Sequence, residues 1–255
     1  MDDHGRDIGE LLREWPHERG RIAARIIEGA DGTPKLQVRL DLGLLQMELD
    51  GRPDGHRPHG APSLLDHLRR RIEDAEAAGD GAGATLDPET CRSLREEAVQ
   101  VYHRYVALFS LGDWERVVRD TTRNLEVIEL CRRHAEREED RLLLEQFRPA
   151  VVAMRARAEA EAAVARRAPR DAVAALDAGL DELRSFFEAH AAPEEAEPAF
   201  EASGEVQLLR GMRDALVPKL PASQRAELEE RLRAALDAEN YELAAILRDE
   251  LRMMR

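Results

Sequence analysis

The chain has 255 residues, of which 35% are charged and only 4% aromatic, and its formal net charge is −14. That acidic balance argues against direct nucleic-acid binding, which usually needs a basic face to displace counterions from phosphates. The sequence has no run of about 18 apolar residues that could span a membrane and no apolar signal core in its start, MDDHGRDIGE, so we expect a cytoplasmic protein rich in helix.

The first 62 residues predict a small antiparallel β-sheet. Residues 8–15 are expected to form a short helix, and residues 21–29, rich in β-branched residues, a strand that is followed by a turn at ADGTP, residues 30–34. Apolar and polar residues then alternate from Leu36 to Leu49, but the phase reverses after Gly43. We favour a β-bulge at Gly43 within one long strand. A tight turn at Leu42 and Gly43 between two short strands is the alternative.

Residues 50–62 are rich in Gly and Pro and predict a loop that lies over the sheet. The loop carries His56 and His59, and His67 follows. Their spacing belongs to no standard metal motif, and no cysteine or well-placed carboxylate completes a ligand set. We therefore expect neither a metal nor another cofactor.

Residues 63–190 predict a series of amphipathic helices. Capping residues or prolines mark the expected starts, at Ser63, Asp87 followed by Pro88, Asp113, about Glu138, and Pro169. Pro149 should kink or break the helix that begins near Glu138. The expected arrangement is an antiparallel helical bundle or a short solenoid.

Residues 105–127 resemble the middle of a tetratricopeptide repeat, in which a helix, a Gly-Asp-aromatic turn and a second helix stack. The sequence departs from that repeat at Val117, where the repeat has a small residue, and at Asn124, where the repeat has Ala. The small residues of the repeat allow its two helices to pack closely, so bulkier residues at these positions change the packing. Such helical arrays bind proteins more often than they catalyse reactions.

The sequence contains no recognisable catalytic signature. It has no P-loop, GxGxxG, HExxH or GxSxG motif, so we predict no catalytic residues. Cys91 and Cys131 are isolated from each other in sequence, and each lies in a helical pattern, so we expect buried free thiols rather than a disulfide.

The last 65 residues predict a linker followed by a short third region. Residues 191–205 are acidic, rich in Pro and Glu and without periodicity, which is typical of a domain linker. Residues 206–220 predict a helix, and a helical hairpin should close the chain within the region 206–255.

That terminal hairpin carries more apolar surface than one partner helix can cover. Leu228, Leu232, Ala235 and Leu236 lie on one face of the first helix. The second helix, for which Asn240 is a plausible N-cap, has several apolar rows. A hairpin this short is below the roughly 40 residues at which a core supports itself, so it must dock on something.

The hairpin resembles the UVR motif of the excision-repair subunits UvrB and UvrC. The residues that carry this resemblance are Leu228, Leu232, Ala235, Glu239, Tyr241, Glu242, Ala244, Ala245, Leu247, Arg248, Asp249 and Leu251. The resemblance implies association, because such hairpins pair with one another. It implies a protein partner, one with a similar hairpin or a second copy of this chain.

The expected fold class is therefore α+β, mostly α, and the expected function is that of a non-enzymatic protein–protein adaptor. The expected partner-binding residues are Leu228, Leu232, Tyr241, Leu243, Ile246, Leu247, Arg248 and Leu251. Two alternatives remain open, an accessory protein of nucleotide excision repair and an enzyme with an unrecognised site.

Overall fold

The computed structural model describes residues 7–217, 232–236, 243 and 246–248. The chain divides into two compact units, Met1–Arg213 and Asp214–Arg255. The described part of the first unit confirms the expected class, α+β and mostly α, with a three-stranded antiparallel sheet followed by helices. No helix of the described residues is both long and apolar enough to cross a membrane.

The elements follow the predicted starts closely. The strands are β1 (Ala23–Glu28), β2 (Pro34–Arg39) and β3 (Leu44–Glu48). The α-helices are α1 (Gly9–Glu14), α2 (Leu64–Ala77), α3 (Pro88–Leu111), α4 (Trp114–His134), α5 (Glu138–Leu142), α6 (Arg148–Ala165), α7 (Pro169–His190), α8 (Pro193–Ala202) and α9 (Gly204–Leu216), and two short 3₁₀ turns are η2 (Pro58–Gly60) and η3 (Glu145–Phe147).

The capping residues act as the sequence predicts. The side chains of Ser63, Asp87 and Asp113 accept hydrogen bonds from the backbone N–H three residues further on and so begin α2, α3 and α4. The helix expected from about Glu138 breaks after Leu142, and Pro149 lies in the first turn of α6, where its missing N–H costs nothing.

The phase reversal at Gly43 is a turn, so the favoured β-bulge was wrong. Arg39 of β2 pairs with Leu44 of β3. The backbone N–H and carbonyl groups of Leu40 and Gly43 bond each other across Asp41 and Leu42, at 2.9 and 3.4 Å. Two short antiparallel strands therefore replace one long strand, and each keeps its apolar side chains on the same face of the sheet.

One face of the sheet is apolar and packs on the helices. Leu36, Val38 and Met47 form a buried cluster with Val101 and Leu108 of α3. On the opposite face, side-chain hydrogen bonds of 2.9 Å join Arg25 to Gln37 and Gln37 to Gln46 across all three strands. A sheet this small is marginal alone, and α3 supplies the surface that stabilises it.

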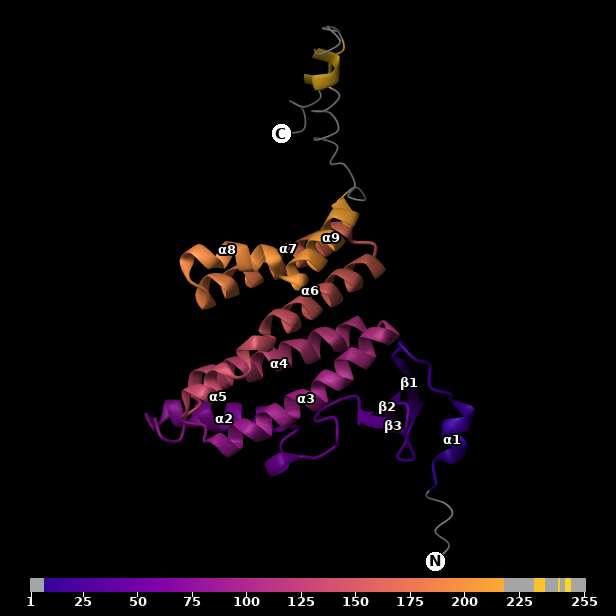
Figure 1. Cartoon of the computed structure of the whole chain (residues 1–255), viewed down its shortest axis with the longest axis vertical. Helices are drawn as coiled ribbons and strands as arrows, with labels where there is room; N and C mark the ends of the chain where they lie inside the picture. Colours follow the sequence, from indigo (N-terminus) through magenta and orange to yellow (C-terminus); the bar gives the residue numbers. More distant parts are fainter. Residues whose placement is uncertain (1–6, 218–231, 237–242, 244–245, 249–255) are drawn as a thin grey trace, which may run out of the picture. The chain divides into compact units, whose positions relative to one another are not determined.

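The long helices form a short stack in chain order. Helix α3 contacts α4, α4 contacts α6, and α6 contacts α7, as Figure 1 shows. The turn between α3 and α4 is the one that resembles a tetratricopeptide repeat. Gly112 adopts a left-handed φ of 74°, and Trp114 lies edge-on to Phe109 with the ring centroids 4.9 Å apart.

Small residues bring α6 and α7 close together. A Cβ atom added at Gly179 of α7 would lie 2.5 Å from the Cβ of Ala156 in α6 and 3.2 Å from Leu209 of α9. Buried alanines, among them Ala160 and Ala163, continue this face of α6. Gly179 therefore sets the separation of the two helices.

The chain forms α8 where the sequence predicted an aperiodic linker. Pro193 stands in the first turn, and Glu194 and Glu195 lie near the positive end of the helix dipole. Ala196 and Phe200, four residues apart, are buried, and Phe200 lies edge-on to Phe187 of α7. The acidic composition therefore belongs to the outer face of a packed helix.

We predict that Gly179→Ala lowers the free energy of unfolding by about 1–3 kcal/mol, because the new methyl group forces α6 and α7 apart. Gly211→Ala is the matched control, since a Cβ at that helical position in α9 meets no atom within 4 Å. The control should gain about 0.5–1 kcal/mol from helix propensity alone. Urea unfolding followed by circular dichroism measures both, and an unchanged Gly179→Ala variant would refute the close packing.

Candidate functional site

The described part of the second unit contains five of the eight predicted partner-binding residues. Leu232, Leu243, Ile246, Leu247 and Arg248 are described, all with helical backbone. The other three, Leu228, Tyr241 and Leu251, lie outside the described residues, as do most of the positions that carry the UVR resemblance.

Leu247 lies in the interior of this unit. It is buried together with Ala235, and Leu232 packs against both. These three residues come from the two stretches that the sequence assigns to the two helices of the hairpin. Leu247 and Leu232 therefore contribute to the interior of this unit.

Large apolar side chains also lie on the outside of this unit. Leu236, Leu243 and Ile246 expose 49%, 39% and 56% of their surface. Two of them were predicted as partner-binding residues, whereas Leu236 was assigned only to the apolar face of the first helix, together with Ala235. Its neighbour Ala235 is buried instead, so the buried face of that helix is narrower than the apolar pattern suggested.

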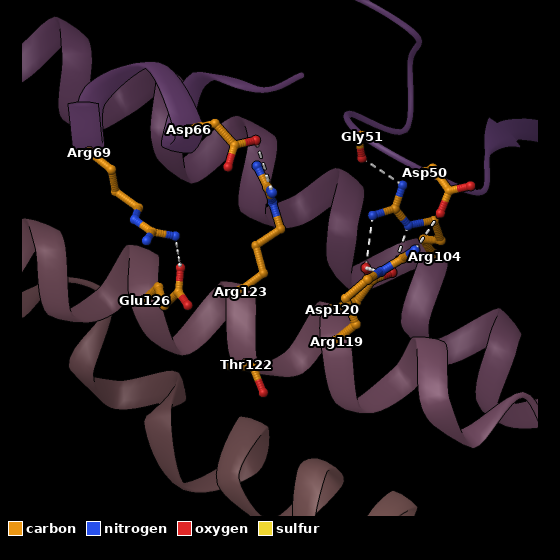
Figure 2. A pocket seen from close by; sticks show the side chains of 10 residues that line it. All are labelled: Asp50, Gly51, Asp66, Arg69, Arg104, Arg119, Asp120, Thr122, Arg123 and Glu126. Carbon is orange, nitrogen blue, oxygen red and sulfur yellow. Dashed lines mark hydrogen bonds and ion pairs between the residues drawn. The ribbon is translucent and has the colours of Figure 1, made fainter. Parts of the chain in front are cut away.

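The first unit contains a polar hollow whose charged lining is comparable to that of a catalytic site. Figure 2 shows its lining, which comes from the segment after β3 and from α2, α3 and α4. The charged residues of this lining are Asp50, Asp66, Arg69, Arg104, Arg119, Asp120, Arg123 and Glu126. Equal numbers of cations and anions give the hollow no excess of either charge.

The deepest pair in the hollow is Arg104 of α3 with Asp120 of α4. Their side chains are 1% and 0% exposed, and two hydrogen bonds of 2.6 and 2.8 Å join them in a bidentate pair. The remaining Nη1 of Arg104 donates to the carbonyl oxygens of Glu48 and Gly51, at 3.1 and 2.8 Å. The guanidinium thus fixes the end of β3 to both helices (Figure 2).

The other three guanidinium groups of the hollow also bind carboxylates. Arg119 contacts Asp50 and Asp120, and Arg69 contacts Glu126. Arg123 donates to Glu97, which is buried next to the hollow. Each cation that could hold an anionic ligand here already has an anion of the chain, so the arrangement is suited to holding α2, α3 and α4 together.

Glu97 is a second buried charge with a structural task. Its two carboxylate oxygens accept hydrogen bonds from the backbone N–H groups of Leu64 and Leu65, at 2.8 and 3.3 Å. These groups have no partner within α2, and a carboxylate also suits the positive end of the helix dipole. Arg52 and Arg123 lie 3.7 and 2.9 Å from the same carboxylate.

One histidine of the loop before α2 contacts a histidine of that helix. The rings of His59 and His67 stack with centroids 4.1 Å apart. Among the described residues, no group of three or more His, Cys, Asp or Glu side chains is arranged to hold a metal ion. Burial lowers the pKa of His67, and positive charge on His59, Arg71 and Arg70 lowers it further.

The two cysteines are free and buried, as predicted. Cys91 lies near the start of α3 and Cys131 near the end of α4, and the thiol of Cys91 donates to the carbonyl oxygen of Leu86 at 3.9 Å. The pKa of the Cys131 thiol is raised by its interaction with the neighbouring Cys91 thiol and by burial. A thiol that stays protonated is a poor nucleophile.

Comparison with family models, with curated proteins and with solved structures finds no match for this chain.

We predict that Asp120→Asn lowers the free energy of unfolding by about 3–5 kcal/mol, because it leaves the buried Arg104 without its counter-charge. Glu126→Gln makes the same chemical change in the half-exposed pair with Arg69 and should cost less than about 1 kcal/mol. Chemical unfolding of both variants at neutral pH provides the measurement. Equal losses in the two variants would contradict the structural role of the buried pair.

We predict that the folded state loses stability as the pH falls from about 6.5. Because the pKa of His67 is lowered in the folded chain, the folded chain takes up a proton on His67 less readily than the unfolded chain does. The contribution of His67 to stability is therefore complete above the pKa of His67 in the unfolded chain. This contribution disappears as the pH drops toward the lower pKa of His67 in the folded chain. His67→Gln should flatten the decline, measured as unfolding free energy between pH 8 and 5, whereas parallel pH profiles would exclude His67 as the cause.

Proposed function

We propose that the chain is a non-enzymatic adaptor whose C-terminal unit binds a partner protein. The observation that carries the proposal is the exposure of Leu236, Leu243 and Ile246 while Leu247 and Ala235 are buried. Exposed leucine and isoleucine side chains favour protein association, because burying them removes apolar surface from water.

The resemblance to the UVR motif supports the same proposal. Hairpins of that kind associate with similar hairpins, so the proposed partner is a protein with a comparable helical hairpin or a second copy of this chain. In the first unit, the charged groups of the polar hollow are bonded to one another, which fits an architectural task better than catalysis.

The structure changes one part of the proposal, the flexible tether expected to connect the C-terminal hairpin to the rest of the chain. An acidic linker at 191–205 would have raised the local concentration of the hairpin for its partner. Those residues include α8, which is packed on α7. The boundary between the two units lies instead at Arg213 and Asp214.

We predict that Ile246→Glu weakens binding of the partner at least about tenfold, since it places a charge where the interface should be apolar. Affinity purification of the full-length chain with quantitative mass spectrometry measures the loss. Sedimentation of the purified protein shows whether the partner is a second copy. Leu42→Glu is the matched control, because Leu42 is also an exposed apolar residue and lies in the turn between β2 and β3 of the first unit.

A chain without residues 223–255 tests the same proposal more coarsely. It should lose the partner and keep the unfolding transition of the first unit, because the two units are separately compact. If wild type, Ile246→Glu and the shortened chain retain the same proteins and the same oligomeric state, the adaptor function is excluded.

A further inference from the structure

The adaptor function makes no use of the two buried thiols of the first unit, Cys91 and Cys131. Both are free in this structure, and neither exposes any of its surface. Cys91 belongs to α3 and Cys131 to α4, the two packed helices that are joined by the turn at Gly112. The thiols are therefore far apart in the sequence but belong to one helical hairpin.

The register of the two helices places the thiols opposite each other. The side-chain amide of Asn124 in α4 donates to the carbonyl oxygen of Ala98 in α3 at 3.0 Å, so these two residues face each other. Cys131 follows Asn124 by seven residues, and Cys91 precedes Ala98 by seven. Seven residues make about two turns of an α-helix. In an antiparallel pair of helices both cysteines are thus displaced by two turns in the same direction along the same interface.

A backbone bridge closes the hairpin at this end. The N–H of Leu86 donates to the carbonyl oxygen of His134 at 2.8 Å, and the N–H of Glu136 donates to the carbonyl oxygen of Leu86 at 2.9 Å. The same oxygen of Leu86 lies 3.9 Å from Sγ of Cys91. Leu86 and Ala135, which pair in this bridge, are both buried. The segment before α3 is therefore bonded to the end of α4 directly beside the thiols.

The two thiols differ in their readiness to lose a proton. Cys91 is the fourth residue of α3, where the helix dipole favours a thiolate, and its interaction with the Cys131 thiol lowers the pKa of Cys91. The same interaction, together with burial, raises the pKa of Cys131. Cys91 is thus suited to attack an oxidant, and Cys131 is placed to react with the oxidised sulfur. Redox-sensitive cysteine pairs combine these two roles.

We propose that Cys91 and Cys131 form a disulfide in response to a peroxide and thereby link α3 to α4 at the end of the hairpin opposite Gly112. Because both thiols are buried, the peroxide reaches Cys91 when the bridge at Leu86 opens locally. The site belongs to the first unit and is independent of the adaptor proposal.

The reaction consumes one hydrogen peroxide and releases two waters. The sulfur of Cys91 attacks one peroxide oxygen, the O–O bond breaks, and the other oxygen leaves as water with the proton that Cys91 gave up. Cys91 is then a sulfenic acid. The sulfur of Cys131 attacks the sulfur of Cys91, the S–S bond forms, and the S–O bond breaks. The second oxygen leaves as water with the proton of Cys131, so two thiols have given two electrons to the peroxide.

The test treats the folded full-length chain with hydrogen peroxide and follows its intact mass. The mass should fall by about 2 Da, the two hydrogen atoms lost in a disulfide, and a non-reducing peptide map should join Cys91 to Cys131. The Tm should rise by at least about 5 °C, because the disulfide closes a long loop in the unfolded chain. Dithiothreitol should reverse both changes.

Single cysteine variants separate the two roles. Cys131→Ser should stop at the sulfenic acid of Cys91, which dimedone traps and mass spectrometry detects. Cys91→Ser should react with peroxide at least about tenfold more slowly than Cys131→Ser, because the remaining thiol stays protonated. Equal rates in the two variants would contradict the assigned order of attack.

Two buried leucines give a matched pair of variants for the bridge. Leu86→Ala weakens the bridge and should speed formation of the disulfide at least about threefold. Leu183→Ala makes the same change at an equally buried position in α7 and should leave the rate unchanged. Equal acceleration by the two variants would show that oxidation needs general unfolding, and would exclude the bridge as the controlling element.

Circular dichroism shows whether each variant keeps its fold, and the wild-type mass and peptide map remain decisive if a variant does not fold. Any of three results would overturn the proposal: no loss of mass by the folded wild type, a disulfide that forms only in urea, or an unchanged or lowered Tm of the oxidised chain.

Peroxide that only adds oxygen atoms to the two cysteines would also overturn the proposal, since it would show that the thiols cannot reach each other.

Discussion

The guanidinium of Arg104 determines how the first unit is assembled. It is buried between α3 and α4, and it binds the Asp120 carboxylate and the carbonyl oxygens of Glu48 and Gly51. Burying a charge is costly unless its partners match it in geometry, and arginine offers a planar set of donors that can satisfy a carboxylate and carbonyls together. A shift of either helix or of the end of β3 would leave a buried donor open. The pair therefore fixes all three at once.

The same logic extends to α2 through Glu97, and it explains where binding can take place. Glu97 caps α2 and binds Arg123, which also lies near Asp66. The carboxylates and guanidinium groups of this region thus bond one another within the fold. The charged residues that are abundant in the sequence stabilise the architecture, and the exposed leucine and isoleucine side chains of the second unit are the surface that the proposed partner would cover.

Local signals made much of the fold predictable, and long-range packing explains the rest. Side-chain caps such as Ser63 and Asp113 act within one turn, so the sequence alone locates the helix starts. The reversal at Gly43 has the same pattern for a bulge and for a turn, and only pairing between β2 and β3 distinguishes them. Helix α8 was missed because its two prolines and its glutamates are typical of linkers, whereas the contact of Phe200 with α7 is visible only in the fold.

The candidate sites show the same division. The apolar pattern of the last residues predicts exposed hydrophobic surface, but it cannot tell that Leu247 turns inward while Ile246 turns outward. Asn124 was noticeable in the sequence only as a departure from the small residue of a tetratricopeptide repeat. An alanine there would bring no amide donor for the carbonyl of Ala98. The departure that weakens the resemblance is therefore the residue whose amide joins α4 to the backbone of α3 within the repeat-like hairpin.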